Sequence, residues 1–408
     1  MSEQKFRSEQ KFSTVSEAIE AIKNGKMVIV ADDEGRENEG DLVCAAEKVT
    51  PEIINFMATE ARGLICMPVS TDIARRLGLG LMTYNTNDEK QTAFTISIDG
   101  TVANGVGTGI SAEDRSITIQ LAMKDNSRAS DFCRPGHIFP LIAKDGGVLE
   151  RQGQTEASVD LAKMAGLKAG GVICEILLPD GTMARRDDLY EFGAKHNIPF
   201  ITVEQMMEYR LQNEIQITKE VEATMPSKHG DFKVLAFTEN VSKKEHLALC
   251  YGDWKNAKPT LVRMHSECLT GDVFASLRCD CNSQLNKALE KIVEEGAGIL
   301  LYLKQEGRGI GLTNKIKAYA LQDKGHDTYE ANRLLGFDDD LREYWVGAHM
   351  LKELGIKSVK LMTNNPDKIS DIERYGVKVE ERVPLVMIND ENKSYVEAKR
   401  DQHNHMIV

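Results

Sequence analysis

Short apolar runs alternate with segments of helical periodicity along most of the chain. Thr14 and Glu17 have the spacing of a capping box, and the apolar run 27–31 that follows this helix start predicts a buried strand. Thr50 and Pro51 have the residue types of an N-cap and a first helical position, which predicts another helix start. Because alternating strands and helices are typical of α/β architecture, we expect an α/β fold of the α+β type, with a mixed sheet and flanking helices in each domain.

The same pattern predicts the remaining elements. In the first half we expect a helix from Ser111 and strands at 27–31, 42–46, 95–98 and 148–150, the last leading through a loop into a helix. In the second half we expect a helix near 313–324 and strands at 233–239, 246–252, 259–267 and 296–303, with another strand starting at 359.

The composition of the chain changes over residues 205–230. A polar helical segment at 203–214 is followed by a Lys/Glu-rich stretch in which Pro226 and Gly230 act as breakers of regular structure. We place a domain boundary in this stretch and expect two domains, 1–210 and 211–408.

Charge and hydropathy exclude several classes of function. The net charge of −12 argues against broad nucleic-acid binding, which requires basic surface, although local arginines can still bind phosphorylated small molecules. No apolar run approaches the roughly 20 residues that a membrane helix needs, and the polar start MSEQKFRSEQKF lacks the apolar core of a signal peptide. We therefore expect a cytoplasmic protein that binds neither membrane nor nucleic acid.

Three of the eight cysteines lie close together. Cys268, Cys279 and Cys281 have the spacing C-x10-C-x-C, whereas Cys44, Cys66, Cys133, Cys174 and Cys250 are scattered, mostly in strand-like contexts typical of buried, inert thiols. A disulfide is disfavoured in a reducing cytosol, and buried or redox thiols are the remaining alternative to metal. Three thiolates suit Zn²⁺, and a fourth position left to water is characteristic of catalytic zinc, because the bound water ionises near neutral pH. His265 is an alternative closing ligand.

Three downstream motifs suggest a phosphorylated substrate. The run EGRGIGL at 306–312 follows an apolar strand, and its glycines allow close backbone approach while Arg308 can bind phosphate. The segments DLR at 340–342 and TNNPDK at 363–368 add charged side chains in turns. Each motif alone is more often solvated surface. Beside a hydrolytic zinc they indicate hydrolysis of a phosphorylated substrate.

Together these motifs carry a family resemblance. RMHSECLTGDVFASLRCDC, Gln284, QEGRGIGL, DLR and LMTNNPDK resemble GTP cyclohydrolase II across most of residues 220–385. The resemblance implies zinc on the cysteine trio, Asp340 as proton acceptor, Arg342 as nucleophile and Tyr319 as an auxiliary catalytic residue. The implied GTP contacts are Arg263, Met264, His265, Ser266, Glu267, Gln284, Glu306, Gly307, Arg308, Thr328, Thr363 and Lys368.

The implied reaction belongs to riboflavin biosynthesis. It opens the imidazole ring of GTP and gives 2,5-diamino-6-(5-phosphoribosylamino)pyrimidin-4(3H)-one, formate and pyrophosphate, with Mg²⁺ accompanying the triphosphate. Three positions depart from the usual pattern: Asn282, Trp345 and His349, the last two standing where small and amide residues are usual. None of them is an implied ligand.

An acidic loop marks the first half. DDEGRENEGD at 32–41 follows a strand, and its carboxylate density suits Mg²⁺, although an exposed charged turn is the ordinary alternative. This loop, ERQGQTEA, GTGISAEDR and RPGHIFPL resemble 3,4-dihydroxy-2-butanone 4-phosphate synthase over residues 12–210. The resemblance implies conversion of ribulose 5-phosphate to the butanone phosphate and formate, with Mg²⁺ or Mn²⁺ on Glu37. The implied sugar-phosphate contacts are Arg36, Glu37, Asp41, Arg151, Gln152, Gly153, Gln154, Thr155 and Glu175.

One position of that site departs from its family. The family loop R-x-G-H-T-E has a histidine as second metal ligand, and this chain has Gln154 there. An amide oxygen can still approach Mg²⁺, but it does not titrate near neutral pH as histidine does. We therefore expect strongly reduced synthase turnover.

Three functional interpretations remain open. The chain is a bifunctional enzyme, or a working cyclohydrolase with a structural N-terminal domain, or a zinc- and nucleotide-binding regulator without turnover. Retention of Asp340, Arg342 and the three cysteines argues against the third. A homodimer is expected from the resemblance.

Overall fold

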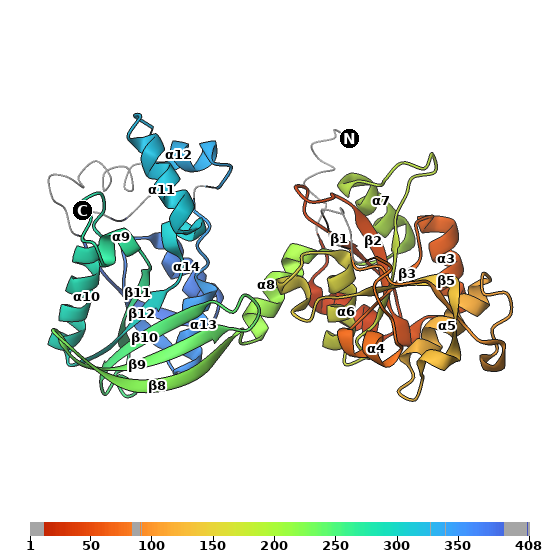
Figure 1. Cartoon of the computed structure of the whole chain (residues 1–408), viewed down its shortest axis with the longest axis horizontal. Coiled ribbons are helices and arrows are strands. Elements are labelled where there is room, and N and C mark those ends of the chain that lie inside the picture. The colour runs from red at the N-terminus through yellow and green to blue at the C-terminus, as the bar shows by residue number, and fades with distance from the viewer. Residues whose placement is uncertain are drawn as a thin grey trace. The chain divides into compact units, whose positions relative to one another are not determined.

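The computed structural model describes residues 12–83, 90, 92–326, 328–338, 340–386 and 406. The chain divides into two compact units, Met1–Arg210 and Leu211–Val408 (Figure 1). Each unit contains a seven-stranded mixed sheet with helices, so the expected fold class is confirmed. The polar N-terminal segment 1–11 lies outside the described residues.

The sheet of the first unit has the order β4-β5-β3-β6-β2-β1-β7. It is mixed because β1 pairs antiparallel with β2 and parallel with β7. Its strands are β1 (Val28–Ala31), β2 (Gly40–Ala45), β3 (Cys66–Val69), β4 (Ile98–Gly100), β5 (Phe132–Ile142), β6 (Gly171–Glu175) and β7 (Phe200–Thr202). The helices are α2 (Val15–Lys23), α3 (Pro51–Phe56), α4 (Thr71–Arg76), α5 (Ala112–Met123), α6 (Gln154–Met164), α7 (Arg186–His196) and α8 (Val203–Asn213).

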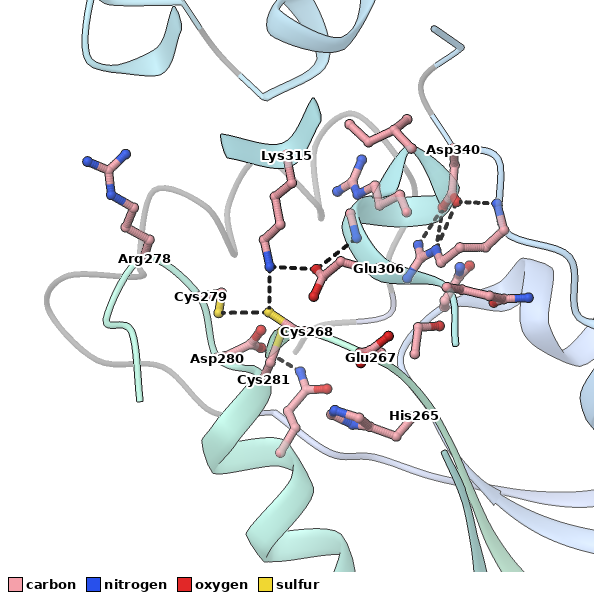
Figure 2. A pocket seen from close by; sticks show the side chains of 18 of the residues that line it. His265, Glu267, Cys268, Arg278, Cys279, Asp280, Cys281, Glu306, Lys315 and Asp340 are labelled. Atoms are coloured by element: carbon pink, nitrogen blue, oxygen red, sulfur yellow. Dashed lines mark hydrogen bonds and ion pairs between the residues drawn. The ribbon is translucent and has the colours of Figure 1, made fainter. Parts of the chain in front are cut away.

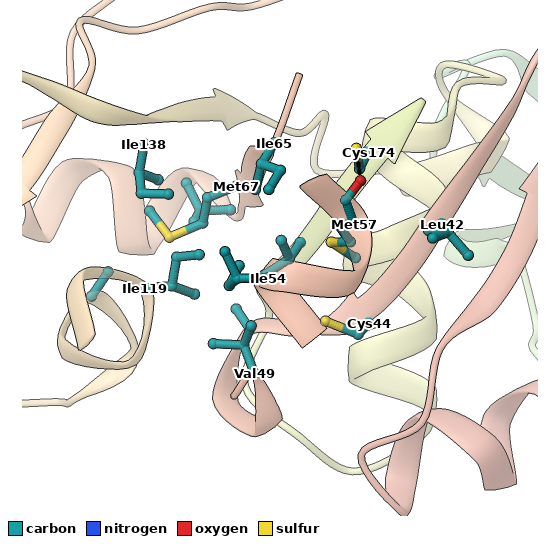
Figure 3. Packing of buried hydrophobic residues seen from close by; sticks show 14 of the residues in the cluster. Leu42, Cys44, Val49, Ile54, Met57, Ile65, Met67, Ile119, Ile138 and Cys174 are labelled. Carbon is teal, nitrogen blue, oxygen red and sulfur yellow. Dashed lines mark hydrogen bonds between the residues drawn. The ribbon is translucent and has the colours of Figure 1, made fainter. Parts of the chain in front are cut away.

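Both faces of this sheet are buried. Along β2, Leu42 and Cys44 point into a cluster with Ile54 of α3 and Ile119 of α5 (Figure 3). The alternate residues of β2 point into a second cluster formed with α2 and α6. A strand with apolar side chains on both faces reads as a continuous apolar run, which is why its position was predictable from sequence.

The sheet of the second unit has the order β14-β13-β11-β12-β10-β9-β8. Its strands are β8 (Ile217–Ser227), β9 (Gly230–Glu239), β10 (Glu245–Gly252), β11 (Thr260–Ser266), β12 (Ala297–Leu303), β13 (Ser358–Met362) and β14 (Lys378–Val383). The helices are α9 (Leu269–Asp272), α10 (Cys281–Glu295), α11 (Gly311–Gln322), α12 (Thr328–Leu334), α13 (Trp345–Glu353) and α14 (Pro366–Arg374).

Helix α10 and helix α13 pack near opposite faces of β11. Leu261 of β11 joins a buried cluster with Ala288 and Ile292 of α10, whereas the side chain of Met264 lies against Gly347 of α13. Because successive side chains of a strand alternate between faces, Arg263 and His265 share the α10 face with Leu261. This alternation directs two of the predicted nucleotide contacts to the same side of the sheet.

The helix-start predictions are confirmed. The hydroxyl of Thr14 accepts a hydrogen bond from the backbone N–H of Glu17, whose carboxylate accepts one from the Thr14 backbone, completing the capping box. Thr50 caps α3 with Pro51 at its first position, and Ser111 caps α5.

Three expectations were wrong in part. Residues 148–150 are not a strand: Gly147–Leu149 form a 3₁₀ turn, in which Gly147 has φ +62° and the N–H of Val148 donates to Asp160. The strand expected at 95–98 is shifted to β4. The Lys/Glu-rich stretch, in which Pro226 was expected to break regular structure, forms the edge strand β8, where Pro226 is tolerated because an edge strand leaves one row of backbone groups unpaired.

Candidate active site

The predicted nucleotide residues line one cleft in the second unit, with a volume of about 230 Å³ (Figure 2). Its walls come from the end of β11, the loop leading into α10, the turn Glu306–Gly309, helix α11 and the loops at 340–342 and 363–368. These segments are far apart in the sequence. The parallel pairing of β11 with β12 and β13 brings their carboxyl ends, and the loops that follow, to one edge of the sheet.

The three cysteines converge at this cleft. The Sγ atoms of Cys268, Cys279 and Cys281 lie within 4.8 Å of one another, and those of Cys268 and Cys279 are 3.7 Å apart. A Cβ on Gly271 would lie 2.8 Å from the Sγ of Cys279 and 3.0 Å from that of Cys268, so only glycine leaves the sulfur atoms their room. The donor set and spacing fit a tetrahedral zinc ion held by three thiolates.

Asp272 orders the loop that carries Cys268. Its carboxylate accepts hydrogen bonds from the backbone N–H of Cys268 at 2.9 Å and from the hydroxyl of Tyr302 at 2.8 Å, and its Oδ1 lies 3.0 Å from Nε2 of His265. Burial lowers the pKa of His265, which favours the neutral ring. Sequence reasoning missed Asp272, although its place between two cysteines was a usable signal. Because its Nε2 lies against the Asp272 carboxylate, the ring of His265 is oriented by Asp272.

Lys315 is a second residue that the sequence analysis missed. Its ammonium lies 3.1 Å from the Sγ of Cys268 and 2.7 Å from Oε1 of Glu306 (Figure 2). Oε2 of Glu306 accepts a 2.6 Å hydrogen bond from the N–H of Leu269, next to Cys268. Burial alone would lower the pKa of Lys315, but Glu306 and the Cys268 sulfur more than offset it and hold the pKa above its usual value. Lys315 thus joins the cysteine loop to the Glu306–Gly309 turn.

The Glu306–Gly309 turn depends on left-handed backbone. Gly307 has φ +62° and Arg308 has φ +63°, an uncommon conformation for a residue with a side chain. A Cβ on Gly309 would lie 2.9 Å from Leu341, and the N–H of Leu341 donates to the carbonyl of Arg308 at 3.0 Å. The turn is therefore packed directly against the segment that carries Asp340 and Arg342.

Asp340 and Arg342 form a pair at the wall of the cleft. The Asp340 carboxylate accepts hydrogen bonds from Nε of Arg342 at 2.8 Å, from its terminal guanidinium nitrogen and from its backbone N–H at 3.0 Å. Burial raises the pKa of Asp340, but these interactions more than offset burial and the pKa is lowered. An ionised carboxylate thus fixes the direction of the guanidinium.

Polar side chains from three segments complete the cleft. The guanidinium of Arg263 donates to the carbonyl of Met362 at 2.9 Å and to Oε1 of Gln284 at 2.5 Å. Burial lowers the pKa of Arg263 to about 10, so it stays cationic at neutral pH. The ammonium of Lys368 donates to the carbonyl of Met264 at 3.1 Å, and the hydroxyl of Thr363 accepts from the N–H of Asn365.

The structure brings most of the predicted second-unit residues together. Met264 does not line the cleft with its side chain, and Thr328 begins α12 with its side chain outside the described part of the chain. Tyr319 lines the cleft, with its hydroxyl 3.2 Å from that of Thr270. The other predicted residues that line it are Cys268, Cys279, Cys281, Arg263, His265, Ser266, Glu267, Gln284, Glu306, Gly307, Arg308, Asp340, Arg342, Thr363 and Lys368.

Two of the three positions that depart from the family pattern, Asn282 and His349, form hydrogen bonds with other parts of the second unit and do not line the cleft. His349 is fully buried, accepts from the N–H of Gln216 at Nδ1 over 3.1 Å, and contacts the carbonyl of Leu211 with Nε2 at 2.7 Å. Asn282 donates from its side chain to the carbonyl of Asp272 at 3.1 Å. Neither residue lines the cleft.

In the first unit, the acidic loop is organised by Asp32. Its carboxylate accepts from the backbone N–H groups of Glu37 at 3.1 Å and Glu39 at 2.9 Å, and it pairs with Arg36 at 2.7 Å. Arg36 also lies 3.1 Å from Oε2 of Glu37. The loop is therefore folded back on a buried carboxylate rather than extended as a solvated turn.

Asp41 and Glu175 face each other on the paired strands β2 and β6. Burial, followed by the charges of Glu175, Glu37 and neighbouring acids, raises the pKa of Asp41 well above its usual value. The side chain of Glu175 accepts from the N–H of Leu64 at 2.8 Å.

The predicted 151–155 loop opens helix α6. Gly153 precedes the helix, and Gln154 and Thr155 are its first two residues and are buried. Arg151 pairs with Glu156 at 2.6 Å and contacts the hydroxyl of Thr92 at 3.1 Å. Gln152, which follows Arg151, is exposed. The predicted sugar-phosphate contacts thus come from the loop before β2, from the paired strands β2 and β6, and from the start of α6 with the loop before it.

The remaining cysteines lie outside the cysteine trio, although Cys66 and Cys174 are close enough to Glu175 and Asp41 to feel their charges. Cys44, Cys66, Cys174 and Cys250 are buried, as expected, while Cys133 is exposed. Burial raises the pKa of the Cys44 thiol to about 12, which leaves it protonated and inert. Among the described residues, no helix is both long and apolar enough to cross a membrane.

Both halves match known families. The family model of 3,4-dihydroxy-2-butanone 4-phosphate synthase matches residues 16–209, and that of GTP cyclohydrolase II matches residues 218–384. The riboflavin biosynthesis protein RibBA of Aquifex aeolicus (strain VF5) is 56% identical over 402 residues, which cover 98% of this chain and 99% of that protein.

Two solved structures are also similar. RibBX of A. baumannii, a two-domain 3,4-dihydroxy-2-butanone 4-phosphate synthase, is 35% identical with a TM-score of 0.66, covering 91% of this chain and 99% of that one. A 3,4-dihydroxy-2-butanone 4-phosphate synthase in complex with two magnesium ions is 37% identical with a TM-score of 0.48, covering 50% of this chain and 98% of that one.

Proposed function

The chain belongs to the family of bifunctional riboflavin biosynthesis proteins, in which a synthase domain precedes a GTP cyclohydrolase II domain, and on that premise we propose how its residues act. The second unit hydrolyses GTP, opening the imidazole ring and releasing formate and pyrophosphate. One observation carries this assignment: the cysteine trio and the Asp340–Arg342 pair line the same cleft. The proposed product retains the ribosyl phosphate, as the resemblance implies.

Cys268, Cys279 and Cys281 would hold the zinc ion, with Gly271 leaving space beside their sulfur atoms. When bound, zinc supplies Lewis-acid activation of water and of the substrate near neutral pH. The positive charge of the Lys315 ammonium lies beside the Cys268 sulfur, and it would hold that sulfur near those of Cys279 and Cys281. Asp272 holds the backbone of the same loop.

Asp340 and Arg342 act on the reacting groups. The ionised Asp340 carboxylate accepts hydrogen bonds from Nε and one terminal guanidinium nitrogen of Arg342, and in this proposal it accepts the proton that Arg342 must lose to act as a nucleophile. Arg342 is thereby oriented as the proposed nucleophile, and Tyr319 lines the cleft near the cysteines as an auxiliary group.

The triphosphate is bound by local cations despite the net charge of −12. Arg263, Arg308 and Lys368 line the cleft, and Arg263 stays charged despite its burial. Mg²⁺ accompanies the triphosphate in this proposal, because it prefers phosphate oxygens and water as ligands. Gln284, Glu267 and Thr363 supply neutral or acidic contacts for the rest of the nucleotide.

The first unit is a lyase-type domain that takes ribulose 5-phosphate in this proposal. Arg36, Asp41, Arg151, Thr155 and Glu175 would contact the sugar phosphate, with the start of α6 offering backbone N–H groups to phosphate. Gln154 replaces the histidine of the family, and we expect turnover to be strongly reduced there. A working cyclohydrolase beside a weakly active synthase unit is therefore the second candidate function, favoured by Gln154 alone.

The test measures zinc and products together. Purified chain should contain about one zinc per chain and release formate and pyrophosphate from GTP. Cys279→Ser should lose both, whereas Cys133→Ser, which changes an exposed thiol, should keep both. Full GTP turnover by metal-free protein would refute the proposal. Light scattering would test the proposed homodimer. A cytoplasmic location is part of the same proposal.

A further inference from the structure

One side-chain cation contacts both residues predicted to hold magnesium. The Nη1 atom of Arg36 lies 2.7 Å from Oδ2 of Asp32, 3.1 Å from Oε2 of Glu37 and 3.4 Å from Oε1 of Gln154. Glu37 and Gln154 are the expected metal ligands. Their oxygen atoms are directed at a nitrogen that already carries positive charge.

The amide of Gln154 is fixed at both ends. Its Oε1 accepts from Arg36, and its Nε2 donates to the carbonyl of Glu39 at 3.3 Å. A flipped amide would place donor against donor at Arg36 and acceptor against acceptor at Glu39, so the two partners together set its orientation. The side chain is only 6% exposed, which leaves it little room to turn elsewhere.

Arg36 is anchored by the buried carboxylate of Asp32. The side chain of Asp32 is fully buried and already accepts the backbone N–H groups of Glu37 and Glu39. If Arg36 withdrew to admit a metal ion, it would leave that carboxylate without the cation that it contacts. The surrounding ionisable groups include Glu39, Asp41, Glu175 and Arg185, and Arg185 is bound to the carbonyls of Glu37 and Asn38.

The expected metal ligands therefore do not fit a divalent ion as they stand. Mg²⁺ needs its oxygen ligands at about 2.0–2.1 Å in near-octahedral order, whereas both of these oxygens already contact the same Arg36 nitrogen, at 3.1 and 3.4 Å.

We propose that Arg36 is the resident cation of the N-terminal site in this chain, held by Asp32, Glu37 and Gln154, and that the site binds sugar phosphates without a divalent metal ion. The inference rests on the proposed function only for the identity of the sugar phosphate. Its physical basis is the replacement of an imidazole by an amide. A neutral imidazole that donates to Glu39 offers its other nitrogen as a ligand for ions such as Mn²⁺, whereas the amide directs its oxygen at Arg36.

Mn²⁺ titration followed by electron paramagnetic resonance tests the cation assignment. The full zinc-loaded chain is titrated without GTP, beside Glu37→Gln, Gln154→His and the double variant. Wild type should bind no more Mn²⁺ than Glu37→Gln. Gln154→His should gain about one ion per chain, and the double variant should lose it. Zinc content and circular dichroism report that each variant is folded.

Two results would overturn the proposal. One is a wild-type Mn²⁺ site that disappears in Glu37→Gln, and the other is a Gln154→His variant that gains no ion. A thermal-shift titration with ribulose 5-phosphate forms the second arm. Its apparent affinity for wild type should be the same within twofold with and without added Mg²⁺, and a tenfold dependence on Mg²⁺ would contradict the proposal. Failure of this sugar to bind any variant would instead refute the substrate assignment, with the Mn²⁺ titration still deciding the cation.

Discussion

The ammonium of Lys315 lies 3.1 Å from the Sγ of Cys268, although 47 residues separate them in the sequence. The same ammonium contacts Glu306 at 2.7 Å, so one side chain joins a predicted zinc ligand to a predicted nucleotide-binding turn. Charged partners of metal ligands commonly change metal affinity or activity by about 10–100-fold when removed. Lys315 is therefore expected to matter although no motif singled it out.

Lys315→Met should lower GTP ring opening by about 10–100-fold, because the Cys268 thiolate and Glu306 lose their shared cation. Formate release and zinc content measure the effect. Lys317→Met is the matched control, since Lys317 lies on the same helix, is exposed and contacts Asn314. Equal activity of the two variants would show that the contact with Cys268 has no functional role.

Gly271→Ala should weaken zinc binding, because the added Cβ would lie within 3.0 Å of two ligand sulfur atoms. Overpacking of this kind costs about 1–3 kcal/mol, which corresponds to roughly tenfold or more in zinc affinity. Competition with a zinc chelator measures it. Gly107→Ala is the control, since its Cβ would make only ordinary contact at 3.5 Å with Asp114. Unchanged zinc affinity in Gly271→Ala would mean that the loop moves aside at no cost.

Arg342→Ala should keep zinc and lose turnover. The guanidinium is bound to Asp340 rather than to any cysteine, so the metal ligands stay in place. Loss of a group that attacks or moves a proton lowers rates by about 10²–10⁴-fold. Arg75→Ala, at an exposed position on α4, is the control. Wild-type formate release from GTP by Arg342→Ala would refute the assigned role.

His349 makes stability depend on pH. Burial lowers its pKa to about 4 from 6.5, so the unfolded chain binds more protons than the folded one between these values. The contribution of His349 to the free energy of unfolding should fall as pH drops from 6.5 to 4 and stay level above 6.5. The shift of 2.5 units corresponds to at most about 3–4 kcal/mol.

His349→Gln should flatten that slope, because an amide can accept from Gln216 and donate to Leu211 without titrating. Urea unfolding at several pH values measures it. The slope should not vanish, since burial also lowers the pKa of His265. An identical pH profile in His349→Gln and wild type would exclude His349 as a source of the pH dependence.

Gln154→His should raise formate release from ribulose 5-phosphate in the presence of Mg²⁺ or Mn²⁺ by about tenfold or more, with the full contribution of acid–base catalysis, about 10²–10⁴, as the upper limit. Gln152→His, two residues earlier, is the matched control and should not raise it. High wild-type activity that Gln154→His does not improve would show that the amide suffices.

The sequence by itself determined most of the elements and most of the residues that line the cleft of the second unit. Buried strands such as β12 read as apolar runs, and capping residues such as Thr14 and Ser111 act within one helical turn, so local patterns were sufficient to find them. The glycines of 306–312 and the closely spaced cysteines are likewise local signals. Most predicted residues of the second unit line one cleft because their motifs follow adjacent strands of one sheet.

The tertiary structure decided which side chains touch. Strand β8 was misread because its residues alternate little between apolar and polar, and pairing with β9 rather than local preference makes it a strand. The contact of Lys315 with Cys268 and that of Arg36 with Gln154 span 47 and 118 residues. No local pattern encodes such pairs, because they form only when separate segments meet at a sheet edge. The substitution at position 154 was visible in the sequence, but only the folded chain placed the Arg36 guanidinium against it.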